Sequence, residues 1–253
     1  MGTYIVTGGA SGIGLAIGQQ LRSEGHRVLT LDIREADIIA DLSTAGGRAA
    51  AASEIRSRCA DGIAGLVACA GLGAHIQDRK AITAVNYFGS VELIEALRDT
   101  LAQHRATVLL ISSNSAPMPT DPAYVEALLC GDEDYASALA EDMESHQVYC
   151  GSKQAVTLWM RRNTPSYAAQ GIRLNAIGPG YTRTPLSAAV ENDSQYGEAI
   201  KHFIESIPIG RPGLPRDIAE AASFLLSEKS AFICGAMLFV DGGHDAMLRP
   251  DKF

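Results

Sequence analysis

The sequence predicts an α/β fold in which helices cover both faces of one doubly wound parallel sheet. Short, nearly continuous apolar segments recur along the chain, which is typical of parallel strands buried on both faces. Segments with a helical period of about 3.6 residues alternate with them. The chain has 253 residues, 47% hydrophobic and 20% charged, and this composition provides a large core for a single domain of this class.

We expect about seven strands flanked by helices, all within a single domain at residues 1–253. The strands are predicted at residues 4–7, 28–31, 38–40, 66–69, 108–111, 173–177 and 237–240. The helices are predicted at about residues 13–25, 45–60, 80–103, 148–170 and 216–227. Two segments interrupt the alternation. One is a proline-containing, acidic insertion at residues 114–147, and the other, at residues 181–207, is interpreted as a substrate lid.

Composition disfavours several classes of function. The formal net charge is −8, without basic clusters, so neither a nucleic-acid nor a membrane partner is expected. The chain has no apolar stretch long enough to span a membrane, and its first residues lack the basic region of a signal peptide, which predicts a cytoplasmic protein. The five cysteines form no Cys-x-x-Cys pair and no histidines are four residues apart, so we expect no metal site.

A glycine-rich turn lies directly between the first predicted strand and the first predicted helix. Its spacing is Gly-x-x-x-Gly-x-Gly, which differs from the Gly-x-Gly-x-x-Gly dinucleotide fingerprint. In this context, glycines let the backbone approach a pyrophosphate at the positive end of the helix. The residues expected to contact it are Gly8, Ser11, Gly12, Ile13 and Gly14.

Asp32 ends the second predicted strand, 18 residues after Gly14. A carboxylate at this position accepts hydrogen bonds from both hydroxyl groups of an adenosine ribose and repels a 2′-phosphate. The repulsion between two such charges is about 1 to 4 kcal/mol at a separation of ~4 Å. The sequence therefore favours NAD over NADP, and we interpret the nearby Arg34 as a solvated surface residue.

Tyr149 and Lys153 are four residues apart in a predicted helix and so share one face. An ammonium near a phenol favours its ionised form, and a phenolate can accept the proton of an alcohol. Ser112 and Ser113 follow the strand at 108–111, at the end of the sheet where parallel sheets bind ligands. Together these residues predict oxidoreductase chemistry.

The chain resembles the classical short-chain dehydrogenase/reductase family over essentially its full length. The shared motifs are Thr7-Gly8-x-x-x-Gly12-x-Gly14, Asp41-Leu42, Ala70-Gly71, Val85-Asn86-Tyr87, Ser112-Ser113, Tyr149-x-x-x-Lys153, Pro179-Gly180 and Asp241-Gly242-Gly243. Within this family it is similar to the bacterial NAD-dependent 3α-hydroxysteroid dehydrogenase/carbonyl reductases. That likeness rests on Asp32-Ile33-Arg34, Ala40-Asp41-Leu42-Ser43-Thr44, Val85-Asn86-Tyr87-Phe88-Gly89 and Met247-Leu248-Arg249-Pro250.

The resemblance implies a Rossmann-type fold and a role for each matching residue. Tyr149 would be the general base in alcohol oxidation, and Ser113 would hold the substrate oxygen. Lys153 would lower the pKa of Tyr149 and bind the nicotinamide ribose, while Asn86 would hold a water in the proton relay. Further cofactor contacts are implied for Asp41, Leu42, Ala70, Gly71, Pro179, Gly180, Thr182 and Thr184, with Asp41 and Leu42 flanking the adenine and Thr184 the carboxamide.

We therefore expect an NAD-dependent oxidoreductase that interconverts a secondary alcohol and a ketone on a bulky apolar substrate, such as a 3α-hydroxysteroid or a similar alicyclic alcohol. Two alternatives stay open. A 3-oxoacyl-thioester reductase using NADPH is disfavoured by Asp32, and a non-catalytic dinucleotide-sensing protein is disfavoured by the presence of Ser113, Tyr149 and Lys153. The resemblance also implies a homodimer or homotetramer, in which the insertion would limit assembly to a dimer.

Overall fold

The computed structural model describes residues 1–185, 187 and 197–252. Seven strands form one parallel sheet in the spatial order β3-β2-β1-β4-β5-β6-β7. They are β1 (Thr3–Thr7), β2 (Arg27–Asp32), β3 (Ile38–Ile39), β4 (Gly65–Ala68), β5 (Thr107–Ile111), β6 (Arg173–Pro179) and β7 (Met237–Val240). The predicted α/β fold with a doubly wound parallel sheet is confirmed.

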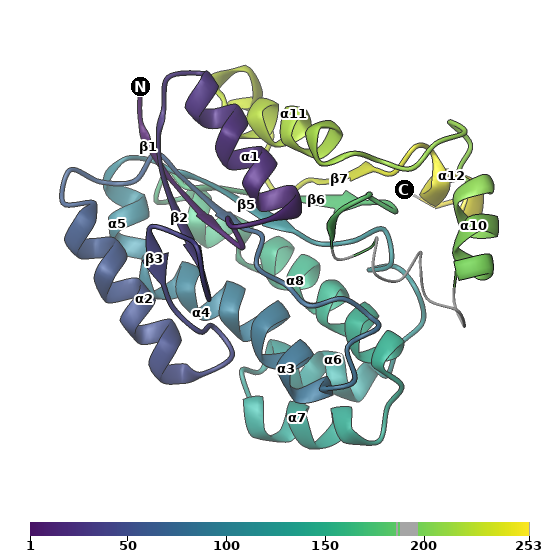
Figure 1. Ribbon diagram of the computed structural model, residues 1–253. Coiled ribbons are helices and arrows are strands. Elements are labelled where there is room, and N and C mark those ends of the chain that lie inside the picture. The colour runs from purple at the N-terminus through teal and green to yellow at the C-terminus, as the bar shows by residue number, and fades with distance from the viewer. Residues whose placement is uncertain (186, 188–196, 253) are drawn as a thin grey trace.

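Helices cover the sheet on both faces (Figure 1). Helices α1 (Gly12–Ser23) and α11 (Pro215–Leu226) lie on one face, and the other face carries α2 (Ala45–Arg58), α4 (Gly89–Ala96), α5 (Arg98–Gln103) and α8 (Ser145–Ala168). Neighbouring residues of a strand face opposite layers. Ile5 packs in the core beneath α2 and α8, while Val6 packs in the core beneath α1 and α11. This double burial explains the continuous apolar strands.

The helix predicted at 80–103 is not continuous, which corrects the sequence-based expectation. The segment divides into α3 (Arg79–Thr83), a π-helical turn η1 (Ala84–Phe88), α4 and α5. Asn86 lies in η1, and its side chain binds the backbone of Leu72 instead of facing solvent. Wider π-helical turns inside helices are frequent at functional sites, and periodicity of apolar residues does not reveal them.

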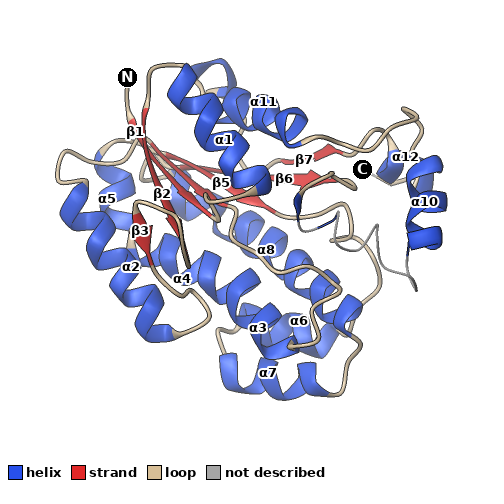
Figure 2. Cartoon of the chain, viewed as in Figure 1, coloured by secondary structure: helices blue, strands red, loops and turns tan. Residues whose placement is uncertain are grey.

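The insertion at 114–147 contains two short helices, α6 (Pro122–Leu129) and α7 (Glu133–Glu141). Each begins at an aspartate that accepts a backbone hydrogen bond, from Ala123 N to Asp121 and from Tyr135 N to Asp132. Helix α6 packs on α8, and α7 packs on α3 and α6. Figure 2 shows both helices on the outer side of α3 and α8, away from the strands. The insertion is therefore an added helical layer.

The expected lid at 181–207 is described in part. It contains α10 (Gly197–Glu205), whereas residues 186 and 188–196 lie outside the described residues. The chain continues through α11, a 3-10 turn η2 (Glu228–Ser230), β7 and α12 (His244–Leu248). In the part of the chain that the structure describes, no helix is both long and apolar enough to cross a membrane.

Candidate active site

A cavity of about 1030 Å³ opens at the carboxyl ends of the central strands. From β1 the chain continues to β2 on one side of the sheet, and from β4 it continues to β5 on the other side. The ends of β1 and β4 therefore border the crevice in which open parallel sheets bind ligands. The cavity lining includes every predicted site residue except Asn86.

The glycine turn between β1 and α1 has a backbone that only glycine readily adopts. Gly8 has a φ of +66° and Gly12 a φ of +54°. A Cβ on Gly8 would lie 2.9 Å from the Cα of Ala70, and a Cβ on Gly14 would overlap the carbonyl oxygen of Gly8. The first amide groups of α1 have no partner within the helix, and Ile13 and Gly14 line the cavity there. The turn is thus suited to bind a phosphate group.

Asp32 lies at the end of β2, facing the glycine turn. Its Oδ2 accepts a hydrogen bond from Ala10 N at 3.0 Å, and its Oδ1 accepts one from Ile33 N at 2.8 Å. The carboxylate is thereby fixed beside the turn while it lines the cavity. This placement suits binding of two ribose hydroxyl groups next to the phosphate site.

Thr7 holds the ends of β1 and β4 together. Its Oγ1 accepts hydrogen bonds from Cys69 N at 3.0 Å and from Ala70 N at 2.9 Å. Burial raises the pKa of the Cys69 thiol to about 12, so that this thiol stays protonated. Thr7 is not among the predicted site residues, although its position just before the glycine turn marks it in the sequence. Thr7 supports the cavity wall.

The loop at Asp41 and Leu42 forms another wall of the cavity. Asp41 Oδ1 accepts a hydrogen bond from Ser43 N at 2.9 Å, and hydrogen bonding to Ser43 holds the pKa of Asp41 below its ordinary value. The Leu42 side chain is buried and packs in the core beneath α2. Both residues line the cavity, on the same side as Asp32.

Lys153 and Tyr149 lie one turn apart on α8, as predicted. Lys153 Nζ donates a hydrogen bond to the carbonyl of Ile111 at 2.9 Å and lies 6.0 Å from the centre of the Tyr149 ring. Ser113 follows β5 and hydrogen-bonds to Tyr149. The helix and the strand end therefore bring a phenol, an ammonium and a hydroxyl group to one region of the cavity.

Burial affects the pKa values of both Tyr149 and Lys153. Burial raises the pKa of Tyr149, and this effect outweighs the lowering effect of the Ser113 hydrogen bond. Burial also lowers the pKa of Lys153 to about 8, which reduces the positive charge available to the phenol near that pH. Desolvation opposes ionisation of both groups, and the spacing of the two residues in the sequence does not reveal it.

The two serines after β5 have different surroundings. Ser112 Oγ donates to the Lys153 carbonyl at 3.0 Å and lies 2.8 Å from Thr157 Oγ1, so it joins β5 to α8. Ser113 Oγ accepts from Ser115 N at 3.0 Å, which fixes this hydroxyl near Tyr149. The hydroxyl of Ser112 is thus engaged with α8, whereas the hydroxyl of Ser113 lies beside Tyr149.

Asn86 lies behind the cavity instead of lining it. Its Oδ1 accepts from Leu72 N at 2.7 Å, and its Nδ2 donates to Leu72 O at 3.1 Å and to Ser152 Oγ at 3.2 Å. A Cβ on Gly71 would lie 3.3 Å from Asn86 Oδ1 and 3.4 Å from Lys153 Nζ. Asn86 and Lys153 therefore both approach the backbone at Gly71.

The segment after β6 crosses the cavity close to the glycine turn. Thr182 Oγ1 donates to Gly180 O at 3.0 Å, and Thr184 lies near Gly12, with its Cγ2 at 3.4 Å from the position of a Cβ there. Gly180 lines the cavity and also packs closely against Asp241, because a Cβ on Gly180 would lie 2.6 Å from the Cβ of Asp241.

Several lining residues were not predicted from the sequence. They come from the loop after β4, from both ends of the insertion and from the segments near α10, and they include Leu72, Gly73, Ala74, His75, Gln77, Asn114, Ser115, Glu144, Ser145, His146, Tyr181 and Phe203. No motif marks them, because loops far apart in sequence meet only in the folded chain. Within the described ranges, no group of three or more His, Cys, Asp or Glu residues is placed to hold a metal ion.

Family comparisons agree with this geometry. Residues 3–127 match the short chain dehydrogenase model, and residues 134–245 match the model described as enoyl-(acyl carrier protein) reductase. The chain is 39% identical over 259 residues to the 3-alpha-hydroxysteroid dehydrogenase/carbonyl reductase of Comamonas testosteroni, covering 100% of both chains. It is 31% identical to 2-(S)-hydroxypropyl-CoM dehydrogenase 3 of Xanthobacter autotrophicus, covering 96% of both chains.

A solved structure is also similar throughout. The 3-alpha-hydroxysteroid dehydrogenase of Pseudomonas sp. B-0831, solved in complex with NADH, has a TM-score of 0.95 and 42% sequence identity. The comparison covers 99% of this chain and 100% of that one. A family model and a full-length relative at 39% identity therefore show that the chain belongs to the short-chain dehydrogenase family.

Proposed function

We propose that the protein is an NAD-dependent oxidoreductase that interconverts a secondary alcohol and a ketone. One observation carries the proposal. A single cavity holds a phosphate-binding turn and Asp32 at one side, and Tyr149, Lys153 and Ser113 at the other. This arrangement fits a dinucleotide at the strand ends and a substrate oxygen beside the phenol.

The residues present fit NAD. The cradle formed by Gly8 and Gly14 leaves no room for side chains, as close approach of a pyrophosphate requires. The Asp32 carboxylate, fixed by Ala10 N, would accept hydrogen bonds from the adenosine ribose and repel a 2′-phosphate. The similar Pseudomonas enzyme was solved with NADH, which supports the same choice of cofactor.

The chemistry divides between the cofactor and the chain. The nicotinamide, when bound, accepts or supplies the hydride. Tyr149 would take the hydroxyl proton during alcohol oxidation and return it during ketone reduction. Ser113 would hold the substrate oxygen by a hydrogen bond, and it already makes one to Tyr149. Lys153 would bind the nicotinamide ribose and stabilise the phenolate when charged.

Asn86 and Lys153 would complete a proton relay behind Tyr149. Both Asn86 Oδ1 and Lys153 Nζ lie beside Gly71, within 3.4 Å of the position that a Cβ would take there. A water held by Asn86 would connect the buried site with the rest of the relay. Asn86 would also keep the loop at Leu72 in place through its two hydrogen bonds.

We assign a bulky apolar substrate, with a 3α-hydroxysteroid or a similar alicyclic alcohol as the first candidate. Leu72, Ala74, Tyr181 and Phe203 add apolar surface to a cavity of about 1030 Å³. Two similar proteins carry 3-alpha-hydroxysteroid dehydrogenase in their names, whereas the Xanthobacter relative is named for a hydroxypropyl-CoM substrate. The loops that differ between such enzymes determine the substrate, while the fold supports the reaction.

A cofactor-linked screen tests this proposal. Steroid, terpenoid, aromatic and alicyclic secondary alcohols are oxidised with NAD and with NADP, and the ketones are reduced with NADH and NADPH. We expect NAD-linked turnover with the highest kcat/KM for a bulky alicyclic alcohol. Preference for NADPH together with reduction of a 3-oxoacyl thioester would overturn the proposal in favour of a thioester reductase.

We further propose that the chain forms a homodimer or homotetramer. Homo-oligomers are usually symmetric, and helices on the α4 and α8 side of the sheet offer extended surfaces for such pairing. Helices α6 and α7 cover part of α8 and α3, which favours the dimer. Sedimentation at micromolar concentration is expected to give a mass of about twice 26.7 kDa, and a monomer would contradict this assignment.

A further inference from the structure

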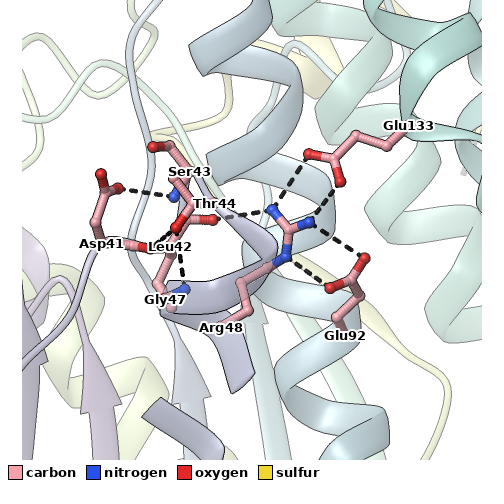
Figure 3. A network of polar contacts seen from close by, with 8 residues as sticks. All are labelled: Asp41, Leu42, Ser43, Thr44, Gly47, Arg48, Glu92 and Glu133. Atoms are coloured by element: carbon pink, nitrogen blue, oxygen red, sulfur yellow. Dashed lines mark hydrogen bonds and ion pairs between the residues drawn. The ribbon is translucent and has the colours of Figure 1, made fainter. Parts of the chain in front are cut away.

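Arg48 of α2 lies buried between two carboxylates from different helices. Its side chain is 2% exposed. The guanidinium binds Glu92 of α4, with Nε–Oε2 at 2.6 Å and Nη2–Oε1 at 3.4 Å. It also binds Glu133 of α7 through Nη1 at 3.2 Å and through Nη2. Figure 3 shows the guanidinium between the two glutamates, which reach it from separate helices.

The same guanidinium binds the backbone of the cavity loop. Arg48 Nη1 donates to the Leu42 carbonyl at 3.3 Å, so one nitrogen connects Glu133 with Leu42 (Figure 3). The first residue of α4, Gly89, lies close against Leu42, because a Cβ there would lie 3.1 Å from the Leu42 Cβ. Leu42 is therefore held between α2 and α4.

The loop around Leu42 is joined closely to the start of α2. Thr44 Oγ1 accepts a hydrogen bond from Gly47 N at 3.0 Å, and a Cβ on Gly47 would overlap the Asp41 carbonyl. Ala40 N donates to the Asp32 carbonyl at 3.0 Å, which places the loop beside Asp32. A shift of Arg48 or of the first turn of α2 would thus move the cavity wall next to Asp32.

The charge balance of this cluster depends on Glu133. Burial by itself lowers the pKa of Arg48, and hydrogen bonds with Glu133 and Glu92 reverse this, so that the pKa is raised overall. If Glu133 were neutral, one carboxylate would remain for a buried cation. The guanidinium would then move toward Glu92 or toward water, and its hydrogen bond to Leu42 would weaken.

We propose that Arg48 is a positioning residue for the adenosine end of the dinucleotide and that Glu133 acts through it. The inference rests on the proposed NAD dependence, because it concerns the loop at 41–44 beside Asp32. It gives the insertion at 114–147 a further role: this segment supplies Glu133 and so supports the cofactor site from the outer helical layer, without lining the cavity at that residue.

The test compares two isosteric substitutions on the same helix. Glu133→Gln removes the carboxylate that binds Arg48. The matched control Glu141→Gln removes a carboxylate of α7 that pairs with the exposed Lys80 of α3. Each variant of the full chain is titrated with NADH by fluorescence, and steady-state oxidation gives the KM for NAD, the KM for the alcohol and kcat. ADP-ribose, which carries the adenosine half alone, is used as a competitive inhibitor.

For Glu133→Gln we expect the KM for NAD, the Kd for NADH and the inhibition constant of ADP-ribose to rise together by roughly threefold to tenfold. The alcohol KM and kcat at saturating NAD stay unchanged, and Glu141→Gln behaves like the wild type. A general loss of folding would lower kcat as well, so the KM-against-kcat split separates positioning from mere stability. Arg48→Lys retains the positive charge but lacks the planar guanidinium. We expect it to raise the KM for NAD, the Kd for NADH and the inhibition constant of ADP-ribose.

Wild-type constants in both Glu133→Gln and Glu141→Gln, with normal NADH binding by the wild type, would overturn this inference and leave the proposed function intact. An equal loss in both variants would also overturn it, because it would show a general effect of α7. Absence of NADH binding by the wild type would overturn the proposed function, and this inference with it.

Discussion

Lys153 Nζ donates a hydrogen bond to the carbonyl of Ile111 at 2.9 Å, which joins helix α8 to the last residue of β5. Lys153 is only 6% exposed, and burial lowers the pKa of its ammonium group to about 8. Because the unfolded chain would keep an ordinary pKa near 10.5, folding and protonation of this group are linked. Because of this link, the free energy of unfolding rises with pH between the folded and the unfolded pKa of Lys153.

The first prediction concerns Lys153→Met. Below pH 8 the folded wild type bears the full desolvation cost of a buried cation. Between pH 8 and about 10.5 the folded chain releases the proton before the unfolded chain does, so the stability of the wild type rises relative to the variant. From pH 7.5 to 9.5 the difference in unfolding free energy is expected to shift by roughly 2 kcal/mol.

Denaturant unfolding of both proteins at the two pH values checks this prediction, with Lys229→Met at an exposed position as the control. A difference between wild type and Lys153→Met that does not change with pH would show that Lys153 retains an ordinary pKa in the folded chain.

The second prediction concerns Tyr149→Phe. Removal of the hydroxyl takes away the proposed proton acceptor and its hydrogen bond with Ser113, while the ring continues to pack. We expect kcat for alcohol oxidation to fall by about 10²- to 10⁴-fold, with NADH affinity almost unchanged. Tyr135→Phe, at a half-exposed tyrosine of α7, is the matched control. If kcat of Tyr149→Phe equals that of the wild type, another group is the base.

The third prediction concerns the cofactor preference. Asp32→Asn removes the negative charge, and its amide oxygen can still accept the hydrogen bond from Ala10 N. The ratio of kcat/KM for NADH to that for NADPH is therefore expected to fall about tenfold, because repulsion of the 2′-phosphate is lost. The check is to measure kcat/KM with NADH and with NADPH for the wild type and for Asp32→Asn, at two ionic strengths. A ratio that stays at the wild-type value would show that another residue selects NAD.

The fourth prediction compares two glycine substitutions. Gly14→Ala places a Cβ onto the carbonyl oxygen of Gly8, so the turn must open, and we expect NADH binding to be lost. Gly46→Ala lies in the first turn of α2 with no atom within 4 Å of its Cβ, and it is expected to be neutral or to stabilise by up to about 1 kcal/mol. NADH titration and thermal unfolding distinguish them. Retained NADH affinity in Gly14→Ala would show that the turn adapts.

Much of this protein follows from local sequence. Strands such as β1 and β5 are continuous apolar runs because both of their faces are buried, and this pattern is visible without a structure. Three site features could be predicted because each depends on short-range geometry. The glycine turn is a tight turn, Asp32 ends a strand, and Tyr149 and Lys153 are one helical turn apart.

Other features depended on contacts between distant segments. The π-helical turn at Asn86 accompanies hydrogen bonds to Leu72, and the pKa values of Tyr149 and Lys153 depend on burial by several elements. Periodicity carries no information on either feature.

The fold class, the cofactor turn and the spacing of Tyr149 and Lys153 depend on local backbone geometry and hydrophobic pattern, so the order of residues is enough to predict them. The electrostatic state of the site and its outer support arise only in the folded chain. Arg48, Glu92 and Glu133 are far apart in the chain, and only packing of α2, α4 and α7 places their charges together beside Leu42. Burial and long-range pairing are properties of the folded chain, and they set how these residues interact.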